Sequence, residues 1–284
     1  MGWELGPDLG VIGASQLVDM ATWTLNRFRE LRIPVPQDSR LERARSIVGA
    51  ASSGHALNSP QLAEAIRTVL EMRWIARALR DAPPRPQRLT NAVATMLSGP
   101  DIEEAANGRT KPRSLQFELY IAALLTAGRV PVKYEEPDLL IHYLGEWVGI
   151  AVKRPRSRRR IAKLIDKAAD QIERRASRGM VAINVDGLLD EAAADGAAWE
   201  KTAGIVDQLP EIRDGIRTLL KRPRVRGLLA LGTPLRWRTA DGRPQLESST
   251  FMKWNFLGLS DSEEKASGAF EQAFRIAFAQ NASY

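Results

Sequence analysis

The sequence predicts a mixed α/β protein in which helices flank a central mixed sheet, preceded by an N-terminal helical region. Apolar residues in the first 80 positions recur at three- and four-residue spacing, which is typical of amphipathic helices. After residue 113 the pattern changes to the order α-β-β-β-α-β. Residues 148–152 form a wholly apolar run, which indicates a strand covered on both faces. We expect a helical region over 1–100 and a sheet domain over 101–284.

The N-terminal helices follow from periodicity and from helix-terminating residues. Ser59-Pro60 places a capping residue before a proline at the first helical position. The segment 81–86 contains three prolines and is expected to be a linker, and a polar loop is expected over 98–113. The helices expected in this region cover 17–28, 40–51, 59–79 and 89–97.

The second part contains alternating helices and strands. A closing helix carries Phe270, Phe274 and Phe278 on one side, which favours core packing. A proline, Pro210, interrupts an expected long helix. The helices are expected at 114–128, 159–178, 197–220 and 262–280, and the strands at 130–134, 138–143, 147–153, 180–185, 227–231, 235–239 and 249–257.

Composition excludes several kinds of chemistry. The 284 residues include no cysteine and two histidines, so thiolate zinc sites, cysteine nucleophiles and mechanisms with paired histidines are not expected. Carboxylates and lysine remain, and these suit hydrolysis assisted by a divalent metal that prefers oxygen ligands. The sequence has no apolar run of membrane-spanning length and no secretory pattern at its start, so we expect a cytoplasmic protein without a membrane partner.

One charge stands alone in the most apolar stretch of the chain. Glu118 is the only charged residue in 114–128, and helical spacing places it beside Ile121, Ala122 and Leu125. Burying a carboxylate is costly unless a cation, a metal or a proton offsets the charge. We therefore expect Glu118 to serve a functional site.

Further polar residues follow at the ends of the expected elements. Pro137-Asp138 begins a strand, Lys153 ends the apolar run, and Gln171 flanks the apolar face of the next helix. With Glu118, these residues resemble the PD-(D/E)XK nuclease superfamily, which has the restriction-endonuclease-like fold. The resemblance covers about 114–186.

The resemblance implies a metal-dependent endonuclease that hydrolyses phosphodiester bonds, with DNA as a more suitable substrate than RNA. By position, Glu118 and Asp138 would hold Mg²⁺ or Mn²⁺, and Lys153 would position or activate the attacking water. Gln171 would steady the site.

The sequence departs from the family at one position, where Ala151 replaces the acidic residue two before the lysine. Three interpretations stay open. Glu118, or else Glu136 or Glu135, supplies the missing oxygen; or the domain is catalytically degenerate and binds nucleic acid or a protein partner; or Ala151 is itself an inactivating substitution.

The net charge of +7 includes a basic cluster at 153–160, in which six of eight residues are basic. Such clusters suit phosphate backbones. We expect contacts to nucleic acid from Arg154, Arg156, Arg158, Arg159 and Arg160. A further hypothesis makes the protein a defence or toxin-type effector, whose N-terminal helices bind a regulatory protein or a second copy of the chain.

Overall fold

The computed structural model describes residues 2–5, 12–52, 60–80, 87–99, 111–155, 157–187, 210–233, 235–240, 243–248, 251–258 and 260–282. The chain divides into two compact units. The sheet unit comprises Met1–Leu9, Leu125–Arg236 and Ser248–Tyr284, and the helical unit comprises Gly10–Leu124 and Trp237–Glu247. This division differs from the expected boundary at residue 100: the helical unit extends to Leu124 and includes Trp237–Glu247, and Met1–Leu9 belong to the sheet unit. The expected linker at 81–86 and most of the polar loop lie outside the described residues.

The helical unit contains the helices that periodicity predicts. The helix α1 packs against α2 and α3, and its buried side chains include Leu25 and Phe28. The next helix, α5, begins in this unit and continues into the sheet unit. The bounds are α1 Ala14–Glu30, α2 Arg40–Ser52, α3 Pro60–Arg80, α4 Gln87–Leu97 and α5 Lys111–Ala127.

Charged side chains are buried inside the helical unit. Arg40 in α2 is fully buried, and its Nη2 lies 3.5 Å from Oε1 of Glu64 in α3. Glu64 also pairs with Arg113 in α5. Gln116 in α5 donates a hydrogen bond of 2.6 Å to Oε2 of Glu71 in α3. Buried polar interactions therefore connect three helices of this unit.

Removing one carboxylate from this network is expected to destabilise the protein strongly. We expect Glu64→Ala to lower the free energy of unfolding by about 3 kcal/mol or more, because two cations lose a buried partner. The control is Glu30→Ala, whose side chain is 61% exposed and pairs with Arg27. It should cost less than about 1 kcal/mol in urea unfolding followed by circular dichroism. Equally small losses of unfolding free energy in Glu64→Ala and Glu30→Ala would contradict a stabilising role of the buried network.

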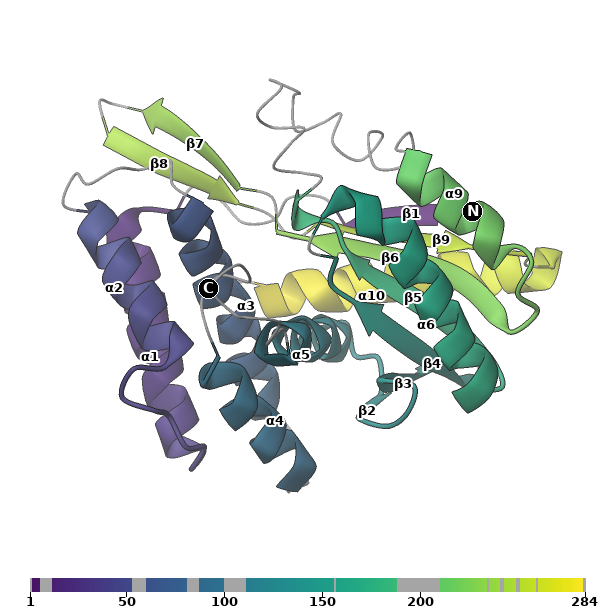
Figure 1. The fold of residues 1–284 in the computed structure, drawn as a ribbon, viewed down its shortest axis with the longest axis horizontal. Helices are drawn as coiled ribbons and strands as arrows, with labels where there is room; N and C mark the ends of the chain where they lie inside the picture. The colour runs from purple at the N-terminus through teal and green to yellow at the C-terminus, as the bar shows by residue number, and fades with distance from the viewer. Residues whose placement is uncertain are drawn as a thin grey trace. The chain divides into compact units, whose positions relative to one another are not determined.

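The sheet unit contains a seven-stranded mixed sheet in the order β1-β9-β6-β5-β4-β3-β2. As Figure 1 shows, β5 lies between β4 and β6, and both of these neighbours pair with it in parallel. The hairpin β3–β4 and the pairs β2–β3, β6–β9 and β1–β9 are antiparallel. The strands are β1 Gly2–Leu5, β2 Val132–Lys133, β3 Leu139–Tyr143, β4 Glu146–Lys153, β5 Gly179–Asn184, β6 Val225–Gly232 and β9 Phe251–Phe256.

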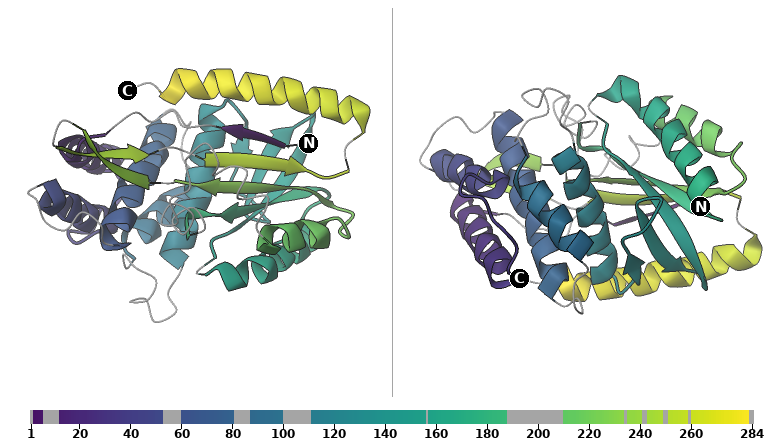
Figure 2. Two further views of the ribbon diagram at one scale, coloured as in Figure 1. Left: turned by 90° about the horizontal axis from the view of Figure 1, so that it is seen from above. Right: turned by 60° about the horizontal axis from the view of Figure 1, so that its bottom comes forward.

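Helices cover both faces of this sheet, as Figure 2 shows. After the 3-10 turn η2 (Arg158–Arg160), α6 (Ile161–Arg175) and α9 (Pro210–Leu219) pack on one face. The other face carries α10 (Asp261–Ala282), in which Phe270 contacts Tyr143 of β3 edge to face at 4.8 Å. Burial raises the pKa of Tyr143 to about 12. The structure thus confirms a mixed α/β protein with helices around a mixed sheet.

Several elements differ from the sequence-based expectation. The strands β1 and β8 (Arg243–Ser248) were not expected, whereas β7 (Leu235–Ala240), which pairs with β8 in a two-stranded sheet, was expected at 235–239. The described part of the expected helix 197–220 begins at Pro210, where proline suits the first helical turn. Residues 188–209 lie outside the described residues. None of the described helices is long and apolar enough to cross a membrane.

Candidate active site

The antiparallel register of β3 and β4 places Asp138 at the end of the apolar strand. Leu139 pairs with Ile150, so Asp138 stands one position further, opposite Ala151. The backbone N–H of Val152 donates a hydrogen bond of 2.7 Å to Oδ2 of Asp138. This bond holds the carboxylate of Asp138 beside the last two residues of β4.

Gly149 allows the residue before Asp138 to approach β4 closely. A Cβ atom added at Gly149 would lie only 2.7 Å from Cδ of Pro137 and 2.9 Å from Cβ of Ala176. The position must therefore lack a side chain for Pro137 to occupy this place. The glycine of the apolar run thus helps to fix Asp138.

Lys153 and Gln171 complete a hydrogen-bonded cluster with Asp138. Nζ of Lys153 donates to Oε1 of Gln171 at 2.8 Å and to the carbonyl of Val152 at 2.9 Å, and it lies 3.5 Å from Oδ2 of Asp138. Nε2 of Gln171 donates to Oδ1 of Asp138 at 3.1 Å and also to the carbonyl of Pro137. We call Asp138, Lys153 and Gln171 the Asp138 cluster.

The Asp138 cluster remains accessible to solvent. The side chains of Lys153 and Asp138 are 20% and 23% exposed. A partly buried ion pair that is held by several hydrogen bonds keeps a fixed geometry while a ligand can still reach it. The structure therefore brings together three of the four residues expected at the site.

Ala151 lies on the same face of β4 as Lys153, because side chains alternate along a strand. It is fully buried and belongs to an apolar cluster with Ile161, Ile165 and Ala168 of α6. A glutamate at this position would have to place its carboxylate among apolar side chains. The position at which the resembled nuclease superfamily carries its acidic residue is therefore buried and has apolar neighbours on α6, although Asp138 stands opposite it.

The fourth expected residue, Glu118, lies on α5 in the helical unit. Glu118, which helical spacing places among apolar residues, is half-buried, whereas Gln116 of the same helix is fully buried. Its role as a metal ligand stays a prediction. Glu135 and Glu136, the alternative donors, are exposed between β2 and β3.

The oxygen atoms of the cluster are of the class that Mg²⁺ and Mn²⁺ bind. They are the carboxylate of Asp138 and, beside the cluster, the carbonyls of Pro137 and Val152, and each accepts a hydrogen bond from Lys153 or Gln171. Asp138 therefore fits as one ligand of a divalent ion. Among the described residues, no group of three or more histidine, aspartate or glutamate side chains is arranged to hold a metal ion.

The expected phosphate-binding arginines do not share one environment. Arg154 is the least accessible of those described: its side chain is 4% exposed and its Nη2 lies 3.5 Å from Oδ2 of Asp186, and its contact with nucleic acid stays a prediction. Arg158 is partly exposed and donates to Oε1 of Glu211 at 2.8 Å. Arg159 and Arg160 are exposed in η2. Arg156 lies outside the described residues.

Comparison with known proteins found no matching family model, no similar curated protein and no similar solved structure. The resemblance to the nuclease superfamily therefore rests on the residues of this chain and on their geometry.

Sequence reasoning missed a buried polar cluster beside the site. Oδ2 of Asp186 accepts a hydrogen bond of 2.8 Å from Asn184, and Oδ1 accepts one of 2.7 Å from the backbone N–H of Thr233. Asn184 ends β5, Asp186 follows it and Thr233 follows β6, and the ion pair with Arg154 joins them to the end of β4. The available signal was the step from an apolar strand to Asn-Val-Asp-Gly at 184–187. This cluster holds together the carboxyl ends of the three parallel strands.

Restoring an acidic residue at position 151 is expected to destabilise the protein. We expect Ala151→Glu to lower the free energy of unfolding by about 2 kcal/mol or more, because a carboxylate enters a filled apolar cluster. The control Ala269→Glu, at an exposed position of α10, should change it by less than about 0.5 kcal/mol. Urea unfolding measures both. An Ala151→Glu protein as stable as the parent would contradict this description of the site.

Proposed function

We propose that this protein is a metal-dependent nuclease that hydrolyses phosphodiester bonds, with DNA as the preferred substrate. The observation that carries the proposal is the Asp138 cluster, in which a carboxylate, an ammonium and an amide meet at the end of β4. The element order α5-β2-β3-β4-α6-β5 supports it, because the restriction-endonuclease-like fold implies this order for residues 114–186.

Asp138 would hold Mg²⁺ or Mn²⁺ through its carboxylate, with Glu118 as the second expected ligand. Such an ion neutralises charge on the phosphate and makes bound water more acidic. Lys153 stabilises negative charge on the phosphoryl oxygens and orients the attacking water. Gln171 positions both reacting side chains, since it donates to Asp138 and accepts from Lys153.

Substrate binding is assigned to the exposed arginines of η2. Arg159 and Arg160 follow the cluster within a few residues of Lys153, and their side chains face solvent. Contacts of arginine with phosphate oxygens position a nucleic acid without reading its sequence. Arg156 and Arg158 keep the same proposed role, and Arg154 keeps it only if its ion pair with Asp186 opens when nucleic acid binds.

A second candidate function is a catalytically degenerate module that binds nucleic acid or a protein partner. The apolar surroundings of Ala151 favour it, because this position cannot supply the usual carboxylate without repacking. Under either function, we retain the proposals of a cytoplasmic protein and of a helical unit that binds a regulatory partner or a second copy.

The catalytic proposal predicts cleavage that depends on the cluster and on a divalent metal. The purified protein should cut plasmid DNA in Mg²⁺ or Mn²⁺, with EDTA preventing the reaction, and an RNA substrate tests the substrate preference. Asp138→Asn and Lys153→Ala should each lower the rate by about 100-fold or more, because each removes charge stabilisation in the transition state.

The matched control is Asp170→Asn, which removes a carboxylate of α6 one residue before Gln171. Asp170 pairs with Arg222 at 2.9 Å and is not part of the cluster. Its variant should cut like the parent. Cleavage by Asp138→Asn or Lys153→Ala at the parental rate would refute the assignment, and binding without any cleavage by the parent would favour the degenerate module.

Both candidate functions predict salt-dependent binding through η2. Log affinity for single-stranded or duplex DNA falls as log salt rises. In an Arg159→Ala, Arg160→Ala double variant this slope should be less steep by about 1.5 to 2. A Lys265→Ala, Arg275→Ala double variant of α10 carries the same charge change and should keep the parental slope. Fluorescence anisotropy at several salt concentrations measures both. Equal slopes for the two double variants would exclude η2 as the contact surface.

A further inference from the structure

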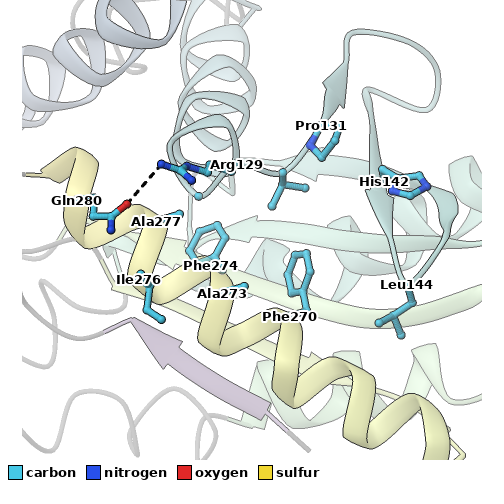
Figure 3. Close-up of a pocket in the computed structure, with 12 residues that line it drawn as sticks. Arg129, Pro131, His142, Leu144, Phe270, Ala273, Phe274, Ile276, Ala277 and Gln280 are labelled. Atoms are coloured by element: carbon cyan, nitrogen blue, oxygen red, sulfur yellow. Dashed lines mark hydrogen bonds between the residues drawn. The ribbon is translucent and has the colours of Figure 1, made fainter.

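The sheet unit contains a second candidate site that shares no residue with the Asp138 cluster. A pocket of about 500 Å³ is lined by α10 on one side and by the turn after α5 and the β3–β4 hairpin on the other, as Figure 3 shows. Pockets of a few hundred Å³ are typical of small-molecule sites.

Aromatic rings form the apolar part of this pocket. Phe270 and Phe274, one helical turn apart on α10, stack with their centroids 6.4 Å apart. The ring of Phe274 packs so closely on Gly128 that no Cβ atom would fit there. The fold therefore holds both rings in place; Phe274 is buried and Phe270 is partly exposed, so Phe270 presents the more accessible part of this apolar wall.

The polar lining residues of the pocket are Arg129, His142 and Gln280, and Arg129 brings a positive charge. Arg129 and His142 lie on the side opposite α10, and the lining residues within the described part of the chain include no aspartate or glutamate. Nη2 of Arg129 donates a long hydrogen bond of 3.5 Å to Oε1 of Gln280. A neutral amide is thus the partner of the arginine, and an anion would be a stronger one.

The backbone holds Arg129 in a conformation that disfavours its side chain. Its φ is 60°, and Val130 N–H donates to the carbonyl of Leu125 at 2.9 Å, which closes α5 with the motif that usually ends in glycine. A second lining residue, Leu144, has φ 50° in the hairpin turn. Residues held in this region are often found at ligand sites.

The same motif ends α1, where Arg32 has φ 56° and Ile33 N–H donates to the carbonyl of Phe28 at 3.0 Å. Arg32 does not line the pocket. The backbone conformation alone therefore does not indicate a ligand. What indicates one is the position of Arg129 beside an aromatic wall. Arg32 provides a matched control, because the two arginines share exposure and backbone geometry.

We propose that this pocket binds a small organic anion, whose apolar ring or chain packs on Phe270 and Phe274 and whose carboxylate or phosphate group pairs with Arg129. The size of the pocket, its aromatic wall and the guanidinium of Arg129, which pairs with a neutral amide, together define this class of ligand. The site is independent of the proposed nuclease activity.

The test is isothermal titration calorimetry of the full chain with 2-naphthoate and with octyl phosphate, using neutral 2-naphthamide for comparison. At least one anion should bind and should exceed the amide in affinity. Arg129→Gly should weaken anion binding by about tenfold or more, because a charged hydrogen bond is lost. Arg32→Gly should leave the affinity unchanged.

Both glycine variants should fold at least as stably as the parent, since glycine suits a positive φ. Loss of binding in Arg129→Gly then reports the side chain rather than unfolding. Ala273→Trp, which places a ring in the pocket from an exposed position of α10, should abolish binding.

Binding of naphthoate alone would assign a flat aromatic ligand, and binding of octyl phosphate alone would assign an alkyl phosphate; either result supports the site. The proposal is overturned if neither anion binds the folded protein at about 1 mM. It is also overturned if the amide binds as tightly as the acid, or if Arg129→Gly and Arg32→Gly have the same effect.

Discussion

The candidate active site depends on the hydrogen bond between the N–H of Val152 and the carboxylate of Asp138, 2.7 Å long. This bond fixes the start of β3 against the end of β4, so that the aspartate and Lys153 meet. The parallel pairing of β4 with β5 requires a crossover, and α6 supplies it. The same crossover brings Gln171 to the cluster. One strand register therefore places three polar side chains from three elements together.

The sequence allowed this part of the site to be predicted because each residue follows from a local pattern. An apolar strand that ends in lysine, a strand that begins after Pro-Asp and a glutamine beside an apolar helix face are all visible within a few residues. The arginines of 153–160 look alike in sequence, however, and only the fold separates Arg154 from Arg159. The ion pair of Arg154 with Asp186 and the pairing of β1 with β9 join distant segments, which local patterns do not reveal.

Ala151 determines how the two proposed functions differ. Its apolar surroundings leave Asp138 as the carboxylate of the cluster, and Mg²⁺ sites in proteins often use one or two carboxylates together with water and substrate phosphates. A single further carboxylate, expected from Glu118 or else from Glu136 or Glu135, would therefore complete a site of ordinary composition. Without it, the same surface retains a lysine and exposed arginines that suit a phosphate backbone.

The most direct test of the account is whether a divalent ion binds at Asp138. Titration of the protein with Mn²⁺, followed by the loss of the free-ion signal in electron paramagnetic resonance, counts bound ions without requiring a substrate. The account predicts a Mn²⁺ site that is present in the parent and in Asp170→Asn and is lost in Asp138→Asn. Equal binding of Mn²⁺ by all three proteins, or no binding by the parent at millimolar Mn²⁺, would contradict it.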